Sequence, residues 1–397
     1  SHDTYGLGHI RRTMAIASHL RGNRVNILIL TGSPIAGRFS FPPQIDFVRI
    51  PGMIKMTNEE YLPLSIKINP KHALQIRKNI ITATAKAFQP HLFIVDKEPL
   101  GLKKEILPTL QWLRRSLPGS RSILGLRDVM DDSSIIRRDW TDKGVYKTLE
   151  NLYSEIWVYG LREFYDPITE YMIPESISAK IHFTGYIPRQ VPSGEVAEKT
   201  RKDFGIKNGE KLVVVTTGGG GDGFLVMDTY LTMLESCRPR LPLKSILVTG
   251  PFMPKEERKH IFKRAKNLGI TTFHFFRQME KLLSAADMAI SMGGYNTLCE
   301  ILSQRTINLV VPREYPRQEQ LIRAKAFHKQ KLLEYIPWTE LKPEKMQEKI
   351  FMMLENPEPY REALQSFRLT GLETMRKRLD GFRNKENAIC QKHRFWG

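Results

Sequence analysis

Short β-rich runs alternate with longer amphipathic stretches, and this alternation occurs in both halves of the chain. Strands are expected at residues 24–30, 45–50, 91–95, 122–126, 156–159 and 180–183, and then at 211–216, 243–249, 271–276, 288–291 and 306–311. Helical patterns lie between several of them, notably at 10–20 and 70–88. Strands that alternate with helices favour βαβ units and parallel sheets. The sequence therefore predicts an α/β protein with two Rossmann-like domains that face each other across a cleft.

The domain boundaries follow from a Pro- and Gly-containing stretch near the middle of the chain. We expect an N-terminal domain at 1–188, a linker at 189–209, a C-terminal domain at 210–370 and a basic helical tail at 371–397. The first Gly-rich loop leads directly into a helix. In a doubly wound sheet such a loop follows a strand. We therefore expect that the given sequence lacks the first strand of the N-terminal domain.

Charge is the compositional feature that bears on function. The 397 residues include 61 Lys and Arg against 42 Asp and Glu, a net charge of +19. Such an excess favours anionic partners such as nucleotides or phospholipid head groups, although a solvated basic surface explains it equally well. Three distant cysteines, Cys237, Cys299 and Cys390, form neither a disulfide framework nor a zinc spacing. With neither a signal-peptide pattern nor an apolar run of spanning length, the sequence favours a cytoplasmic protein.

The first chemically informative loop is Gly6-Leu7-Gly8-His9, which opens the helix that carries Arg11 and Arg12. Glycines let the backbone approach a ligand closely, and the following helix N-terminus offers N–H groups to an anion. Gly8 is therefore a candidate binding residue. His9 has a pKa near neutrality and suits general-base work on a hydroxyl, which makes it the candidate catalytic residue. Asp96, which follows a predicted strand, forms a structural turn, orients His9 or binds the acceptor.

The second half of the chain has three further loops that follow predicted strands. Residues 216–223 include four consecutive glycines, 291–300 combine two glycines with a helix start, and 311–320 end in a polar helix start. Bare backbone N–H groups at such corners suit a phosphate or a sugar. The candidate binding residues are Gly218, Gly219, Gly220, Gly294, Tyr295, Asn296, Thr297, Glu300, Glu319 and Gln320. Taken singly, each loop is also compatible with a flexible turn or a solvated helix start.

The order of these loops resembles inverting GT-B glycosyltransferases of family 28, a group that includes the bacterial N-acetylglucosaminyltransferase of the peptidoglycan lipid precursor. The run 291–300 followed by 317–324 is similar to the sugar-donor signature of that family, and Gly6–His9 is similar to its acceptor-side loop. The resemblance implies that His9 is the base, that Glu300 binds the ribose and that Glu319 and Gln320 lie near the donor sugar.

Within the same resemblance, residues 218–221 correspond to the glycine loop of the C-terminal domain. Residues 294–297 correspond to the start of the helix at the diphosphate. Two departures stand out. Tyr295-Asn296 is bulkier and more polar than the small apolar pair usual in the family, and Arg317-Gln318-Glu319-Gln320 replaces the usual Asp-Arg-Gln-Gln.

These features predict an inverting glycosyltransferase. It would move a sugar from a UDP-sugar to an acceptor hydroxyl, and the expected sugar is an N-acetylhexosamine. No cofactor or metal is expected, because helix N-termini can stabilise the departing diphosphate and the chain has no Asp-x-Asp motif. Three alternatives remain open: a nucleotide-sugar 2-epimerase of the same fold, a Rossmann oxidoreductase, and a non-enzymatic basic nucleotide-binding protein. The acceptor is not specified by the sequence, and a lipid-linked acceptor is among the options.

Two basic segments suggest reversible contact with an anionic membrane. Residues 55–78 mix apolar side chains with Lys and Arg, and the tail 376–397 carries seven Lys and Arg against two acidic residues. Basic residues near an anionic bilayer contribute about 1 kcal/mol each. Both segments are also compatible with ordinary solvated faces. Nucleic acid is not an expected partner, because no nucleic-acid-binding motif accompanies the charge.

Overall fold

The computed structural model describes residues 8–22, 24–34, 36–38, 40–55, 61–236 and 242–394, with side chains described as far as Arg383. The chain divides into two compact units. Unit 1 contains residues 1–128, 133–187 and 370–397, and unit 2 contains residues 129–132 and 188–369. The expected linker 189–209 thus belongs to unit 2, and the expected tail belongs to unit 1. The loop residues 5–7, the segment 56–60 and two of the cysteines, Cys237 and Cys390, lie outside what the structure describes at side-chain level.

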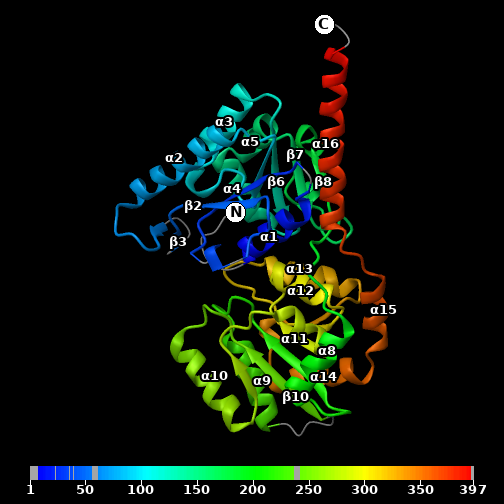
Figure 1. Ribbon diagram of the computed structural model, residues 1–397. Helices are drawn as coiled ribbons and strands as arrows, with labels where there is room; N and C mark the ends of the chain where they lie inside the picture. Colours follow the sequence, from blue (N-terminus) through cyan, green and yellow to red (C-terminus); the bar gives the residue numbers. More distant parts are fainter. Residues whose placement is uncertain are drawn as a thin grey trace. The chain divides into compact units, whose positions relative to one another are not determined.

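Unit 1 alternates strands and helices from α1 to β8 and is completed by the C-terminal helix (Figure 1). Its elements are α1 (Gly8–Leu20), β1 (Ile27–Thr31), η1 (Ala36–Arg38), β2 (Ile45–Arg49), β3 (Met53–Lys55), β4 (Tyr61–Pro63), α2 (Pro70–Phe88), β5 (Leu92–Asp96), η2 (Leu102–Lys104), α3 (Leu107–Ser116), β6 (Arg121–Arg127), α4 (Ser133–Lys143), α5 (Val145–Leu152), β7 (Glu155–Tyr159), α6 (Pro167–Glu170), α7 (Glu175–Ser178), β8 (Ile181–Phe183) and α16 (Gly371–Arg394).

The described strands of unit 1 form two pieces of parallel sheet and one small antiparallel pair. One parallel piece has the order β5-β6-β7-β8, the other pairs β1 with β2, and β3 pairs antiparallel with β4. Helix α1 buries Ile10 and Ala17 against Ile29 of β1 and Ile45 of β2. This packing follows from the helical spacing of its apolar residues.

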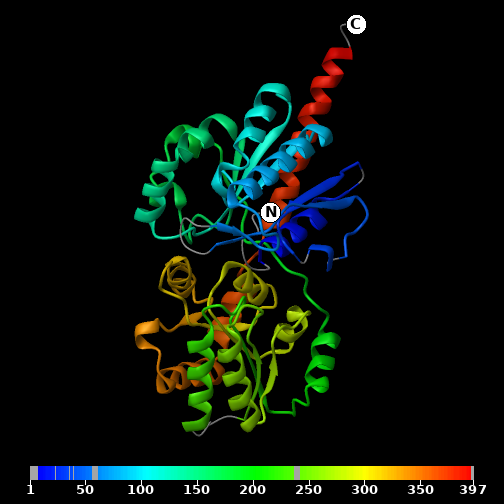
Figure 2. The ribbon, with the colours of Figure 1, turned by 90° about the vertical axis from the view of Figure 1, so that its left-hand side faces the viewer.

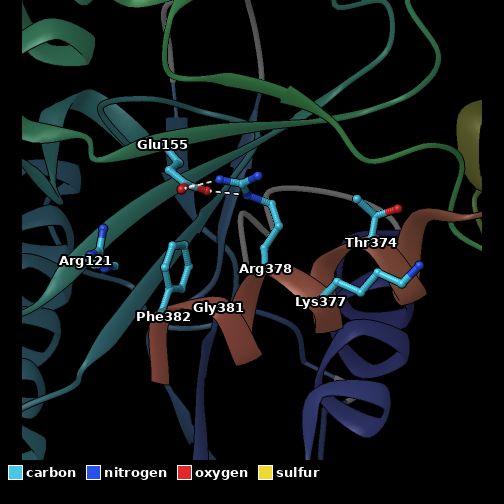
Figure 3. Close-up of a pocket in the computed structure, with 7 residues that line it drawn as sticks. All are labelled: Arg121, Glu155, Thr374, Lys377, Arg378, Gly381 and Phe382. Atoms are coloured by element: carbon cyan, nitrogen blue, oxygen red, sulfur yellow. Dashed lines mark hydrogen bonds and ion pairs between the residues drawn. The ribbon is translucent and has the colours of Figure 1, made fainter. Parts of the chain in front are cut away.

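Helix α16 is held to the body of unit 1 by its basic side chains. Arg378 donates from Nε and Nη2 to both carboxylate oxygens of Glu155, at 2.7 and 2.5 Å, as Figure 3 shows. The guanidinium of Arg121 lies 4.6 Å from the ring centroid of Phe382. Arg376 donates to the backbone oxygens of His19 and Arg21 at the end of α1. Some basic side chains of the tail therefore serve to hold helix α16 to the rest of unit 1.

Unit 2 repeats the strand–helix alternation more regularly. Its elements are α8 (Gly194–Asp203), β9 (Lys211–Thr216), α9 (Phe224–Ser236), β10 (Leu243–Val248), α10 (Lys255–Asn267), β11 (Thr271–Phe273), α11 (Met279–Ala285), β12 (Met288–Ser291), α12 (Tyr295–Ser303), β13 (Ile307–Val310), α13 (Glu319–Lys329), β14 (Glu334–Tyr335), η3 (Trp338–Glu340), α14 (Pro343–Glu355) and α15 (Glu358–Ser366).

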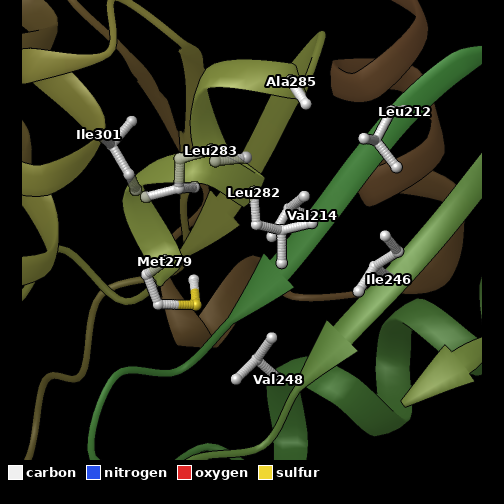
Figure 4. Close-up of a cluster of buried hydrophobic side chains, with 10 residues drawn as sticks. Leu212, Val214, Ile246, Val248, Met279, Leu282, Leu283, Ala285 and Ile301 are labelled. Carbon is white, nitrogen blue, oxygen red and sulfur yellow. The ribbon is translucent and has the colours of Figure 1, made fainter. Parts of the chain in front are cut away.

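The strands of unit 2 form one parallel sheet of order β11-β10-β9-β12-β13-β14. Helix α9 contacts α10 and α14, and α11 contacts α8 and α12. In Figure 2 helices flank the sheet of unit 2 on either side. One core cluster joins Leu212, Val214, Ile246 and Val248 of the sheet to Leu282 and Leu283 of α11 (Figure 4). The strand order reverses at β9, so the loops after β9 and β12 meet where doubly wound folds bind ligands.

The predicted fold class is confirmed for each unit, and all eleven predicted runs contain strands. The boundaries differ by a few residues at most strand ends, because a β-rich run does not mark where pairing stops. No described helix is both long enough and apolar enough to span a membrane.

Candidate functional site

The candidate catalytic side chain of unit 1 lies beside a buried carboxylate. His9 is in the first turn of α1, which begins at Gly8, and Asp96 is the last residue of β5. The two are brought together across 87 positions of sequence: Nδ1 of His9 lies 2.6 Å from Oδ2 of Asp96. The side chains are 17% and 9% exposed. Of the three roles left open for Asp96, the contact supports that of orienting His9.

Arg12 fixes the other side of this carboxylate and was not predicted as a functional residue. It lies one helical turn after His9, is 1% exposed, and donates to both oxygens of Asp96 at 2.7 and 2.9 Å from Nη2. Its guanidinium lies 5.8 Å from the ring centroid of Tyr159. Burial alone would raise the pKa of Asp96, but Arg12 and His9 outweigh it and hold that pKa well below its usual range.

The charge on Asp96 determines which nitrogen of His9 carries the proton. An ionised carboxylate can only accept, so Nδ1 must be the donor and Nε2 keeps its lone pair. The contact of 3.1 Å between Nη2 of Arg12 and Nδ1 is then a close approach of two N–H groups. Burial lowers the pKa of His9 to about 4, although Asp96 partly opposes this shift. His9 is therefore neutral near pH 7, with Nε2 as the nitrogen that can accept a proton.

In unit 2, the glycine loop after β9 lies against the start of α12. Gly218 has a φ of +64°, and a Cβ built on it would lie 2.9 Å from Oγ1 of Thr297. The structure thus brings together two candidate residues that are 79 positions apart. Gly219 is exposed and lies beside the ring of Phe252.

Gly220 has a different role from its neighbours. Its φ is +89°, and an added Cβ would lie 2.1 Å from the backbone oxygen of Thr249. Gly250, after β10, makes the reciprocal close approach, because its added Cβ would lie 2.4 Å from the oxygen of Gly218. Gly220 is therefore needed for packing one loop backbone against another. This does not test its predicted contact with a ligand.

The N-terminus of α12 has the features of an anion-binding site. Gly293 adopts a φ of +70°, and Gly294 is the N-cap, where no side-chain hydrogen bond caps the first turn. The backbone N–H groups of Asn296 and Thr297 belong to this turn. Such groups, together with the helix dipole, stabilise an anion.

Side chains on α12 point to different environments. Tyr295 is 2% exposed, with Arg323 5.7 Å from its ring centroid, so its side chain is part of the core and only its backbone faces the helix terminus. The predicted binding role of Tyr295, which rests on its place at the start of the helix, stays a prediction. Asn296 accepts at Oδ1 from Nη2 of Arg189 at 2.9 Å. Glu300 is half-buried one turn later, on the same helix face as Asn296.

Arg189 was not predicted as a site residue. Its Nε and Nη1 atoms are buried, and no hydrogen-bond partner for them lies among the residues that the structure describes. Its backbone N–H donates to Oγ of Ser303 at 2.9 Å. The guanidinium of Arg189 therefore places positive charge beside the N-terminus of α12, where an anion would bind.

The helix start at Glu319 and Gln320 is organised by Arg313, which sequence reasoning also missed. Nη2 of Arg313 lies 2.6 Å from Oε1 of Glu319, and its Nη1 lies 2.8 Å from Oδ2 of Asp222 in the glycine loop. The backbone N–H of Arg313 donates to Oε1 of Gln320 at 2.9 Å. Glu319 is 7% exposed. One carboxylate oxygen of Glu319 is thus bound by Arg313, and the amide oxygen of Gln320 is occupied by the backbone of the same residue.

A buried arginine links this helix to the glycines before α12. Arg323 is 1% exposed and donates to the backbone oxygens of Gly293 and Val129 at 3.1 and 3.3 Å. Residues 129–132 belong to unit 2, where Asp131 accepts from the backbone N–H of Gln318 at 2.9 Å. Buried charge-assisted hydrogen bonds of this kind fix loop geometry. No group of three His, Cys, Asp or Glu able to hold a metal ion occurs in the described ranges. The expected independence from metal stays a prediction.

Residues 213–379 match the family model of the glycosyltransferase family 28 C-terminal domain. The chain is family-28-like and has the GT-B fold. It is 26% identical over 209 residues to UDP-N-acetylglucosamine–N-acetylmuramyl-(pentapeptide) pyrophosphoryl-undecaprenol N-acetylglucosamine transferase of Aquifex aeolicus, covering 52% of this chain and 56% of the relative. The enzyme of that name from Streptococcus thermophilus is 30% identical over 157 residues, covering 39% and 41%. The chain therefore matches about half the length of these relatives.

Solved structures extend the likeness to the fold of both units. MurG of Acinetobacter baumannii has a TM-score of 0.60 at 14% identity, covering 94% of this chain and 96% of that one. A UDP-glucosyltransferase from Polygonum tinctorium has a TM-score of 0.66 at 12% identity, covering 96% and 97%. At such identities the likeness establishes the GT-B fold alone. The predicted family resemblance is confirmed, and the roles of the individual site residues stay predictions.

Proposed function

We propose that this family-28-like protein is an inverting glycosyltransferase that moves N-acetylhexosamine from a UDP-sugar to an acceptor hydroxyl. The observation that carries the proposal is the N-terminus of α12, which no side chain caps and against which the glycine loop of β9 packs, within the segment that matches the family model. This arrangement suits a diphosphate, whose charge grows when the sugar leaves. Arg189 and the first-turn N–H groups would stabilise that charge.

The side chains of unit 1 would supply the proton transfer that this reaction needs. Nε2 of His9 takes the proton of the acceptor hydroxyl, and the hydroxyl oxygen then forms a bond to the anomeric carbon. The bond between that carbon and the diphosphate oxygen breaks, and the nucleoside diphosphate leaves with the bonding electrons. Asp96 stabilises the imidazolium that forms on His9. A single displacement of this kind inverts the anomeric configuration.

Glu300 and Gln320 would select the sugar donor. We assign Glu300 to the vicinal hydroxyls of the ribose, because it lies about one and a half turns from the α12 N-terminus and its carboxylate can accept two hydrogen bonds. Gln320 would donate from its NH2 group to the sugar, since Arg313 occupies its oxygen. Arg313 and Arg323 would then act by holding the two loops in place.

A direct product assay tests the proposal. The protein is incubated with UDP-N-acetylglucosamine alone and with a pyrophosphoryl-undecaprenol N-acetylmuramyl acceptor of the kind named for the relatives. Mass spectrometry then follows both sugars. Transfer only in the presence of acceptor, with an inverted anomeric centre by proton NMR, is expected. Conversion of the sugar nucleotide without acceptor would instead indicate a 2-epimerase, and binding without any conversion would indicate a non-enzymatic protein.

We further propose reversible contact with an anionic membrane through the segment at 64–68. Leu64, Ile66 and Ile68 are 38, 43 and 36% exposed, and Lys67 is exposed between them. Arg77 in the following helix does not contribute, contrary to expectation, because it is 2% exposed and bound to Glu105 at 2.6 Å. Apolar side chains interleaved with basic ones are typical of interfacial segments.

Flotation with vesicles tests this contact. Recovery on phosphatidylserine-containing vesicles should exceed recovery on neutral vesicles and should fall as salt shortens the Debye length from about 10 Å at 0.1 M to about 3 Å at 1 M. Replacing Ile66 and Ile68 with serine should reduce it further. Equal recovery on both vesicle types would remove the membrane from the proposal without affecting the glycosyl transfer.

A further inference from the structure

A cavity of about 380 Å³ lies between helix α16 and the first residues of two strands in unit 1 (Figure 3). Its lining combines three basic side chains with a carboxylate, a hydroxyl and an aromatic ring: Arg121, Lys377, Arg378, Glu155, Thr374 and Phe382. Arg121 begins β6 and Glu155 begins β7, so the cavity lies at the amino ends of parallel strands. Asp96 is the last residue of β5. Because the seven-residue strand β6 is roughly 20 Å long, the cavity is separate from the candidate catalytic pair.

The carboxylate of this cavity is already bound by its neighbours. Oε2 of Glu155 accepts from Nε of Arg378 at 2.7 Å and from Nε1 of Trp157 at 2.8 Å, and Oε1 accepts from Nη2 of Arg378 at 2.5 Å. Burial alone would raise the pKa of Glu155, but the hydrogen bonds from Arg378 and Trp157 outweigh it and lower that pKa. Glu155 is therefore ionised, and its charge neutralises that of Arg378.

The other two basic side chains carry charge that this carboxylate does not balance. Among the residues that the structure describes, neither the guanidinium of Arg121 nor Nζ of Lys377 has a hydrogen bond or an ion pair. The guanidinium of Arg121 lies over the ring of Phe382, 4.6 Å from its centroid, and in this arrangement its N–H groups stay available to an acceptor. Nη1 of Arg378 takes no part in the contacts with Glu155. The cavity therefore offers hydrogen-bond donors and an excess of two positive charges.

We propose that this cavity binds the phosphate group of a small phosphate monoester. Such a group carries a charge of about −1.5 to −2 near pH 7, which matches the two unbalanced cations. Its oxygens accept hydrogen bonds, and guanidinium and ammonium groups are the side chains that bind phosphate best. At about 30 Å³ for a water-sized atom group, the five heavy atoms of a phosphate fill less than half of the cavity. The remaining space, beside the ring of Phe382, suits the organic part of the ester.

The bound ester would link helix α16 to the sheet of unit 1. Arg121 belongs to β6 and Lys377 to α16, so a phosphate between them joins the two elements. On the same helix, Arg376 donates to the backbone oxygens of His19 and Arg21 at the end of α1, the helix whose first turn carries His9. The inference does not depend on the proposed glycosyl transfer, because it rests only on side chains of α16, β6 and β7.

Calorimetric titration with glycerol 3-phosphate tests the proposal, with UDP present in excess so that a nucleotide site elsewhere is filled. The double variant Arg121→Gln/Lys377→Gln removes the two unbalanced charges and keeps the pair of Arg378 and Glu155. Its affinity should be about tenfold lower or weaker still, as expected for lost charged hydrogen bonds. The matched control is Arg114→Gln/Lys147→Gln, which removes the same charges from exposed positions on α3 and α5 and should bind like the wild type. Succinate, a dianion without phosphate, should bind the wild type at least about tenfold more weakly than glycerol 3-phosphate.

Hydrogen exchange of the unaltered chain gives a readout that needs no variant to fold. Amides at 374–382 should exchange more slowly when glycerol 3-phosphate is present. Phosphatidylcholine vesicles that contain phosphatidic acid distinguish the two sources of the phosphate. Flotation that the double variant reduces and glycerol 3-phosphate competes away would assign the site to a lipid head group, whereas binding of glycerol 3-phosphate without such flotation would assign it to a free ester.

Four results would overturn the proposal. They are an absence of binding to both glycerol 3-phosphate and the vesicles, equal affinity in the double variant and the wild type, equal affinity for succinate, and unchanged exchange at 374–382. The second of these would place the bound phosphate elsewhere on the basic surface, and the third would show an anion site without preference for phosphate.

Discussion

The candidate centres of the two units are built from different parts of the chain. In unit 1, three charged or titratable side chains, His9, Arg12 and Asp96, contact one another in a largely buried place. In unit 2, the centre consists mainly of backbone: a helix N-terminus and a glycine loop, with arginines that hold them. Side chains supply proton chemistry, whereas oriented N–H groups supply a fixed electrostatic environment. The two centres should therefore respond differently to mutation and to pH.

The largest effect is expected from removing the proton acceptor of unit 1. His9→Ala should lower kcat by about 10²- to 10⁴-fold, the usual contribution of general acid–base catalysis, while the affinity for the sugar donor stays nearly unchanged. Steady-state kinetics and calorimetric titration with UDP-N-acetylglucosamine measure the two quantities. The matched control is His72→Ala, since His72 is exposed on α2. A His9 variant that turns over like the wild type would exclude this histidine as the base.

A single methyl group added to the glycine loop should disrupt the backbone centre of unit 2. Gly220→Ala should destabilise the protein by about 2–4 kcal/mol, because the alanine must adopt a positive φ and its Cβ would collide with the oxygen of Thr249. Gly221→Ala is the control, since an added Cβ meets nothing within 4 Å there. Urea unfolding compares the two. Equal stabilities would contradict the loop packing described above.

Glu300 tests whether the backbone centre also needs a carboxylate. If it holds the ribose, Glu300→Ala should weaken UDP binding by about 1.5–3 kcal/mol, as expected for a lost charged hydrogen bond. Isothermal calorimetry with UDP measures this, with Glu340→Ala, an exposed carboxylate of η3, as the control. Unchanged affinity in the Glu300 variant would assign this residue to the helix surface alone.

The loops of the backbone centre can be located from the sequence more readily than the contacts of the side-chain centre, and the reason is physical. Glycine runs and strand ends are local signals, so the loops at 216–223 and 291–300 can be identified from the sequence. The partners of the charged residues depend on tertiary structure. Asp96 is the last residue of its strand and lies 84 positions after Arg12, so only the folded sheet brings them together. The sole local hint was the spacing of His9 and Arg12, which places both on one helix face.

The same reasoning explains the burial of the Tyr295 side chain and the three missed arginines of unit 2. Neighbours on a helix point in directions about 100° apart, so Tyr295 packs in the core while Asn296 does not. The missed arginines contact loops that are distant in sequence: they are Arg189, Arg313 and Arg323. Their side chains are long enough to reach several different hydrogen-bond partners. In a sequence rich in arginine, no local signal indicates which arginine makes such a contact. The strands themselves were predictable, because buried parallel strands consist of continuous β-branched and apolar runs.

The smallest expected effect concerns pH, and it distinguishes the two centres most directly. Because burial lowers the pKa of His9 to about 4, the free enzyme should keep this base neutral down to mildly acidic pH. At pH 5.5 about 97% of such a histidine is neutral, against about 9% for one with the ordinary pKa of 6.5. Between pH 7.5 and 5.5, kcat/KM should therefore change by less than about twofold. It should then fall as the pH approaches about 4.

The sign of the stability effect follows from the same shift. The folded pKa of His9 lies below the unfolded value, so the unfolded chain binds more protons between about pH 6.5 and 4, and this histidine's contribution to stability is lost as the pH falls through that window. Binding of UDP-N-acetylglucosamine to the backbone centre should stay constant over pH 5.5–7.5, because the helix N-terminus does not titrate. Rate and binding profiles over this range, measured with one preparation, check both statements. An acid limb in kcat/KM near pH 6.5 would mean that a solvated histidine, or a group other than His9, accepts the proton.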